Sequence, residues 1–111
     1  MKLPNADLAV IPDQKIINYL LDEFHPQNKG KAKFYKMVGY TTDNPQLLNE
    51  ALKTLAQNGD VTGIEPTARG TKYVVEGSIN APNERTYQLT SVWMIQETQN
   101  EPRLVTAYPK K

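Results

Sequence analysis

The sequence contains no cysteine and only one histidine, His25. Without cysteine the chain can form no disulfide, no thiolate zinc site and no thiol nucleophile. A single histidine also rules out a metal site built mainly from imidazoles, and the carboxylates are too scattered to suggest another kind. Any catalysis therefore depends on His25, lysines, arginines and hydroxyls, and we expect no metal or other cofactor.

Long apolar runs and a strong net charge are missing as well. No apolar stretch approaches the roughly 18 residues of a membrane span, and the start, MKLPNADLAVIPDQ, with its prolines and acidic residues, is unlike a signal peptide. We therefore expect a cytoplasmic protein with no membrane partner. The formal net charge is only +1, so binding to a polyanion would need a local cationic patch.

The chain of 111 residues, with 39% hydrophobic and 23% charged side chains, is typical of a single globular domain over residues 1–111. Its first half has the periodicity of helices. A first helix is predicted from a cap at Asp13 to the HPQN segment, and a second from about Gly30 to Val38. The first helix has one predicted apolar face, made of Ile16, Ile17, Leu20, Leu21 and Phe24.

A third helix is predicted after the segment TTDNPQ. Asp43 or Asn44 can cap it, Pro45 suits its first turn, and Asn58-Gly59 ends it. Its predicted buried stripe consists of Leu47, Leu48, Ala51, Leu52 and Leu55.

The second half changes to the alternating pattern of β-strands. The predicted strands are residues 60–66, 71–79, 85–97 and 102–109. The connections between them are too short for crossover helices, which predicts an antiparallel meander. The predicted fold class is therefore α+β, with two to three N-terminal helices packed on one face of a four-stranded antiparallel sheet.

The segment HPQNKGKAKFYK, residues 25–36, concentrates candidate functional groups. His25 either ends a helix as a structural residue or serves as a general acid or base. Lys29, Lys33 and Lys36 are spaced for one helical face, while Lys31 faces elsewhere. Such a face is either solvated or binds phosphate or RNA, and free N–H groups at a helix N-terminus would also favour anions.

The last strand, PRLVTAYPKK, offers a second set of candidates. Thr106 and Tyr108 could hydrogen-bond a substrate while Arg103 steadies an anion, or they could be ordinary residues of a half-buried strand. Simple alternation puts Arg103 and Thr106 on opposite faces, so both serve one site only across a bulge or at the sheet edge. Arg85, at the start of the third strand, is another candidate cation.

No nucleotide-binding, serine-hydrolase or zinc-protease motif is present. The remaining groups, one histidine with lysines, arginines, Tyr and Thr, are those of a metal-independent ribonuclease. In such an enzyme the ribose 2′-OH attacks the neighbouring phosphate, an acid and a base transfer protons, and cations stabilise the phosphorane charge.

The order of short motifs resembles an uncharacterised group of small bacterial domains. The matching residues are Met1 to Asn5, His25-Pro26, Lys31-Ala32, Phe34, Gly39-Tyr40, Tyr73-Val74-Val75, Trp93, Ile95 and Pro102 to Tyr108. That group is similar to the barnase–EndoU–colicin–RelE superfamily of ribonuclease toxins in its order of elements, its early His/Lys segment and its closing T-x-Y-P. The sequence departs from the pattern at Asn28, where many members have glycine, in the loop that directs His25.

The resemblance implies RNA cleavage, or a toxin-module role with a cognate neutralising protein. The catalytic candidates that it implies are His25, Lys31, Arg103, Thr106 and Tyr108. A non-catalytic module on the same fold, binding RNA or a protein through the Lys29–Lys36 face, remains the alternative. A neutralising partner protein and a regulator outside nucleic-acid biology also remain open, as does a homodimer formed through a sheet edge.

Overall fold

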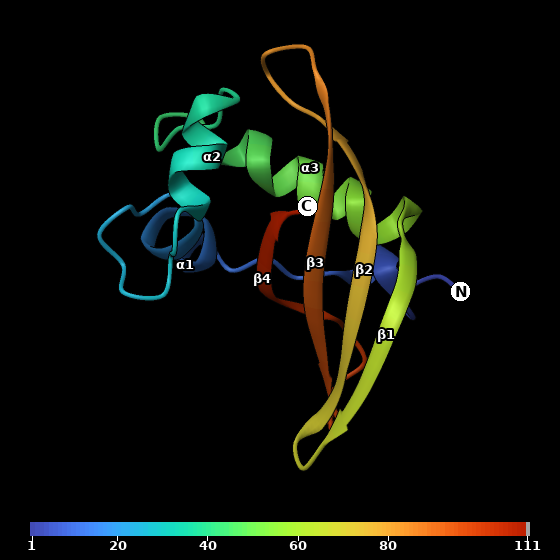
Figure 1. The fold of residues 1–111 in the computed structure, drawn as a ribbon. Coiled ribbons are helices and arrows are strands. Elements are labelled where there is room, and N and C mark those ends of the chain that lie inside the picture. Colours follow the sequence, from blue (N-terminus) through green and yellow to red (C-terminus); the bar gives the residue numbers. More distant parts are fainter. Residues whose placement is uncertain (111) are drawn as a thin grey trace.

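The computed structural model describes residues 1–110 and has two layers of secondary structure (Figure 1). The three helices are α1 (Asp13–Lys15), α2 (Lys31–Met37) and α3 (Pro45–Asn58). The four strands are β1 (Asp60–Thr67), β2 (Gly70–Asn80), β3 (Thr86–Gln96) and β4 (Arg103–Pro109). The strands pair antiparallel in the order β1-β2-β3-β4. The predicted α+β class, meander and helical layer are confirmed.

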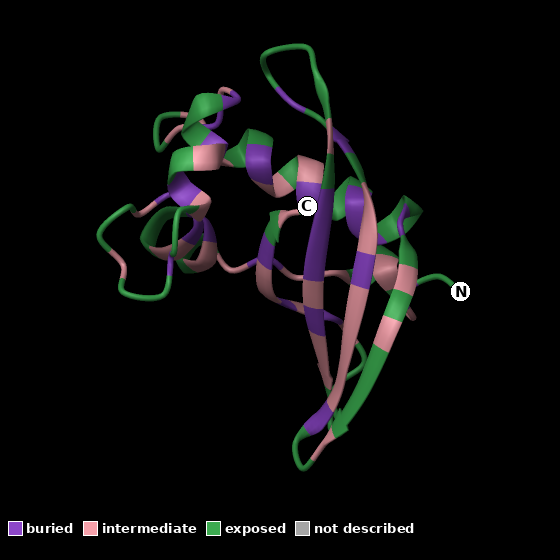
Figure 2. Ribbon diagram, in the orientation of Figure 1, coloured by how far each residue is buried: buried purple, intermediate pink, exposed green. Residues whose placement is uncertain are grey.

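α3 crosses one face of the sheet and supplies much of the helical part of the core (Figures 1 and 2). Asn44 precedes it and Pro45 opens it, as predicted. Its fully buried side chains are Leu48, Leu52, Leu55 and Ala56. The helix packs closely on β2, because a Cβ at Gly77 would lie 2.7 Å from Leu55 Cδ1. Leu47, predicted in the buried stripe, is 38% exposed at its margin.

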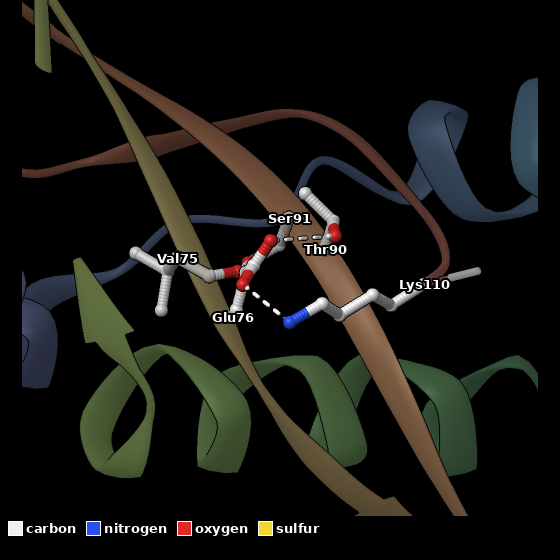
Figure 3. A network of polar contacts seen from close by, with 5 residues as sticks. All are labelled: Val75, Glu76, Thr90, Ser91 and Lys110. Carbon is white, nitrogen blue, oxygen red and sulfur yellow. Dashed lines mark hydrogen bonds and ion pairs between the residues drawn. The ribbon is translucent and has the colours of Figure 1, made fainter. Parts of the chain in front are cut away.

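Polar atoms inside this core are paired. Trp93 is fully buried, and its indole N–H donates to Ser91 Oγ at 2.8 Å. Ser91 in turn donates to the Val75 carbonyl at 3.0 Å (Figure 3). This chain of bonds allows an indole and a hydroxyl to be buried without the cost of an unpaired donor.

The opposite face of the sheet has no helix over it within residues 1–110 (Figures 1 and 2). Here Glu76 accepts hydrogen bonds from Lys110 Nζ at 2.9 Å and from the Thr90 hydroxyl at 3.4 Å (Figure 3). The two faces therefore differ in chemistry, as the alternating pattern of the strands predicts. No helix in the described part of the chain has both the length and the apolar character to cross a membrane.

The first helical segment ends earlier than its apolar periodicity predicts. α1 continues directly into a π-helical turn, Ile16–Leu20, and the chain then leaves the helix. The side-chain amide of Asn28 donates to the carbonyls of Tyr19 and Leu20, which a further helical turn would otherwise use. Hydrogen bonds from Asn28 therefore replace those that the next helical turn would make.

This early end corrects several predictions. Ile16, Leu20 and Leu21 are buried as expected, but Ile17 is 41% exposed and Phe24 is 92% exposed. Both were wrongly placed on the buried face, because the predicted period applies only while the helix continues. The capping prediction for Asp13 is also wrong, since Pro12 precedes the helix and Asp13 is its first residue.

Candidate active site

A cleft of about 570 Å³ lies between the first helical segment, the loop that follows it and β4. Its lining residues are Pro12, Gln14, Lys15, Asn18, Tyr19, His25, Gln27, Arg103, Val105 and Thr106. Among the described residues, no carboxylate lines this cleft, whereas three other hollows of the surface each include Asp or Glu. The whole chain is nearly balanced, with 13 Lys and Arg and 12 Asp and Glu. A lining that has cations and no carboxylate is therefore locally positive and favours an anion.

A β-bulge brings the β4 candidates to one side. Leu104 lies opposite Trp93 and Thr106 lies opposite Val92, which leaves Val105 as an extra residue in the register. Simple alternation would separate Arg103 from Thr106, but the bulge restores both to the cleft. β4 is also an edge strand whose start forms a parallel bridge with Val10, so the N-terminal segment steadies Arg103.

Tyr19 lies at the centre of the arrangement. Its hydroxyl and the Thr106 hydroxyl are 2.8 Å apart, and either group can donate this hydrogen bond. Lys15 Nζ and Lys31 Nζ lie 5.3 Å and 5.6 Å from the centre of the Tyr19 ring, within the range of cation–π attraction. The bond between the two hydroxyls uses one of their two hydrogens, so the other can be donated toward the cleft.

The rings of His25 and Tyr19 pack in a T-shaped arrangement, with their centres 5.1 Å apart. Its Nδ1 accepts a hydrogen bond from the Gln27 backbone N–H at 3.1 Å. This bond places the proton of the neutral imidazole on Nε2. His25 is half-buried in the cleft lining, so Nε2 is the ring nitrogen left for a substrate.

A family model described as "Domain of unknown function (DUF6883)" matches residues 2–111. The protein belongs to this family. No curated protein matches the chain. A chain from a structure titled "Contact-dependent growth inhibition toxin - immunity protein complex from Klebsiella pneumoniae 342" is similar in fold, with a TM-score of 0.75 and 16% sequence identity. The alignment covers 96% of this chain and 97% of that one, and at this identity the likeness shows the fold alone.

The DUF6883 domain brings only some of the sequence-predicted residues into the cleft. His25, Arg103 and Thr106 line it. Lys31 lies behind Tyr19, where its ammonium donates to the Asn28 carbonyl at 3.2 Å and reaches within 5.9 Å of the Tyr108 ring centre. Lys31 therefore borders the site through Tyr19, and Tyr108 lies beyond it, beside Lys31. Their assignment as catalytic residues stays a prediction.

The predicted phosphate-binding cations lie elsewhere in the DUF6883 domain. Lys33 and Lys36 are exposed on α2, and Lys29 precedes that helix in a left-handed conformation with φ of 53°. Lys29 therefore does not continue the helical face on which it was predicted. Arg85 is exposed in the loop that joins β2 to β3. None of these four cations is among the residues that line the cleft.

Sequence reasoning missed Lys15, Tyr19 and Gln27. Lys15 and Tyr19 are one helical turn apart, on a stripe next to that of Ile16 and Leu20, and this spacing was the available signal. Gln27 acts through its backbone N–H, which no residue pattern reveals. Within residues 1–110, no three His, Asp or Glu side chains gather in a way that could hold a metal ion.

Proposed function

We propose that this domain is a metal-independent ribonuclease of a bacterial toxin-type module. The observation that carries the proposal is a cleft without carboxylates that combines His25, two cations and two hydroxyls. A phosphodiester is an anion with a leaving group that needs a proton, and these groups match both needs. The fold likeness to a chain of a toxin–immunity protein complex adds support, as does the sequence resemblance to ribonuclease toxins.

The proposed reaction starts with attack of the ribose 2′-oxygen on the adjacent phosphorus. The 2′-hydroxyl loses its proton, the bond to the 5′-oxygen breaks, and that oxygen gains a proton, leaving a 2′,3′-cyclic phosphate and a 5′-hydroxyl. Nε2 can accept a proton only when Nδ1 carries one, so in the proposed reaction a proton on Nδ1 replaces the Gln27 hydrogen bond. His25 Nε2 then takes the proton of the 2′-hydroxyl and passes one to the 5′-oxygen. Arg103 and Lys15 neutralise the charge that builds up on the phosphoryl oxygens, and Thr106 with Tyr19 donates a hydrogen bond to one of them.

The cleanest test is cleavage of total RNA by the purified protein in the presence of EDTA. We expect fragments that end in 2′,3′-cyclic phosphate, and a fall of about 100- to 10,000-fold in rate for His25→Ala. Production of the wild type in cells should arrest growth, and His25→Ala should relieve that arrest. A folded wild-type protein that leaves total RNA intact in EDTA, with equal growth of both strains, would rule out the proposal.

A non-catalytic module that binds RNA or protein is the second candidate. It is favoured by Lys29, Lys33 and Lys36, which are exposed and make no ion pair with any other described residue. This candidate predicts binding of single-stranded RNA without cleavage and with a steep dependence on salt. Replacing Lys29 and Lys33 by Gln should then reduce the salt dependence by about two phosphate contacts. An unchanged slope would exclude RNA binding through this surface.

A further inference from the structure

We propose that Asn28 is a positioning residue of the cleft, which holds His25, Lys31 and Tyr19 in one arrangement. The part of this inference that concerns cleavage rests on the proposed function. The part that concerns geometry does not, and it can be tested separately. Asn28 touches no cleft surface itself: its residue is 2% exposed, although its side chain is polar.

The side chain of Asn28 joins two helical segments. Its Nδ2 group donates to the Tyr19 and Leu20 carbonyls, and its Oδ1 accepts the Ala32 N–H at 2.8 Å. One amide thus caps the end of the first segment and the start of α2 at the same time. A buried amide lowers the stability unless its hydrogen bonds are made, so this geometry fixes both helix ends relative to each other.

The backbone of Asn28 extends the same contacts to the proposed site residues. Its N–H donates to the His25 carbonyl at 3.0 Å. Its carbonyl accepts from the Lys31 N–H at 3.1 Å and from Lys31 Nζ at 3.2 Å. The next two residues, Lys29 and Gly30, both have positive φ, which turns the chain from this loop into α2.

The residues of the site are held in two different ways, although the hydrogen bond between Tyr19 and Thr106 joins them. His25, Lys31 and Tyr19 depend on Asn28, whereas Arg103 and Thr106 are held by the sheet register. A change at Asn28 should therefore misdirect the proton-transfer group while leaving the phosphate contacts on β4 in place. For the proposed enzyme, this predicts a fall in kcat without a matching rise in KM.

Asn44 provides a matched control. Its Oδ1 accepts the Thr41 N–H at 2.9 Å, so it is also a side-chain amide that secures a turn next to a helix, the turn before α3. It is absent from the residues that line the cleft. Asn44→Ala should lower stability as a lost side-chain hydrogen bond does, with no effect on His25.

The single histidine makes the geometry measurable by NMR, since the imidazole Hε1 of His25 gives one assignable signal. In the full chain, Asn28→Ala should move this signal, and Asn44→Ala should leave it unchanged. Asn28→Ser keeps a hydroxyl that can accept from the Ala32 N–H and puts no charge beside the Tyr19 and Leu20 carbonyls, so it serves if the alanine variant does not fold. A folded Asn28 variant with an unmoved His25 signal overturns the inference.

The kinetic arm uses the same variants on RNA. We expect kcat of Asn28→Ala to fall on the order of 100-fold with KM nearly unchanged, and Asn44→Ala to match the wild type. A wild type that cleaves no RNA would refute the proposed function alone, because the NMR arm still decides the role of Asn28. Equal kcat for the wild type and Asn28→Ala, or a change confined to KM, would overturn the positioning role.

Discussion

The packing of α3 on the sheet differs in kind from the packing of the His25 segment beside β4. α3 is a 14-residue helix that buries an apolar stripe against the sheet, where it packs on β2. The segment from α1 to α2 instead consists of short helical pieces around a buried amide, with a π-helical turn and two left-handed residues. Apolar area determines the position of the first. The second combines the burial of Ile16, Leu20 and Leu21 with directed hydrogen bonds.

This difference suggests a division of roles. Substitutions in the α3 core should change stability and leave the cleft chemistry intact in the molecules that remain folded. Substitutions on the His25 side should change the chemistry more than the stability. The predictions below test the division from the largest expected effect to the smallest.

Arg103→Ala should lower RNA cleavage by about 100- to 1,000-fold, because it removes a cation from the phosphoryl oxygens. Arg85→Ala is the matched control, since Arg85 is an exposed arginine outside the cleft. We expect it to keep the wild-type rate, and initial rates on a defined RNA would compare the two. Equal losses in both variants would show that net charge, and not the cleft, matters.

Leu52→Ala should lower the free energy of unfolding by about 2–5 kcal/mol, because Leu52 is fully buried in the α3 core and leaves a cavity. Urea titration followed by tryptophan fluorescence would measure it through Trp93, the only tryptophan. Leu47→Ala is the control at the exposed margin of the same helix and should cost much less. A loss of cleavage by the folded Leu52→Ala protein would contradict the division of roles.

The same contrast explains how much could be predicted from the sequence. The four strands and α3 follow from alternation, from the 3.6-residue period and from the Asn44-Pro45 start, because each signal is local. The end of the first helix depends on Asn28, which lies beyond it in sequence and acts through hydrogen bonds to carbonyls. The periodicity therefore placed Phe24 inside, although it is 92% exposed.

The cleft was predicted only in part for a related reason. His25, Arg103 and Thr106 were identifiable by residue type. A bulge in the last strand, or a site at the sheet edge, was the predicted condition for Arg103 and Thr106 to serve one site. Whether Val105 bulges is decided by pairing with β3, which no local pattern encodes. Tyr19 is central because its segment packs against β4, where it meets Thr106. The two residues are far apart in the chain, so only the fold reveals their contact.

Tyr19→Phe should distinguish the contribution of the Tyr19 hydroxyl from that of its ring. The ring contacts with His25 and the lysines remain, and only the hydrogen bond to Thr106 is lost. We expect a loss of about 0.5–1.5 kcal/mol in stability and a roughly tenfold fall in cleavage. Thr106→Val removes the other partner of the same bond. A double variant whose effects simply add, in stability or in cleavage, would contradict coupling of the two hydroxyls.

Tyr35 should make the stability of the protein fall at high pH. Its buried hydroxyl donates to the Ala107 carbonyl at 2.7 Å and so joins α2 to β4. Burial raises the pKa of Tyr35, and the neighbouring Tyr40 and Tyr19 raise it further. The stability that Tyr35 contributes is therefore complete below the unfolded pKa of about 10 and is lost as pH rises above it, because only the unfolded state then ionises.

Urea titrations of the wild type at pH 8 and above pH 10 should therefore show a fall in the free energy of unfolding. Tyr35→Phe should flatten that fall, while being less stable at pH 8 because the Ala107 carbonyl loses its donor. Burial also raises the pKa of Tyr40, so part of the slope should survive in Tyr35→Phe and shrink in the double variant with Tyr40→Phe. A pH dependence identical in the wild type and Tyr35→Phe would show that Tyr35 ionises as freely in the folded protein as in the unfolded chain, and that the junction of α2 with β4 is more open than its hydrogen bond implies.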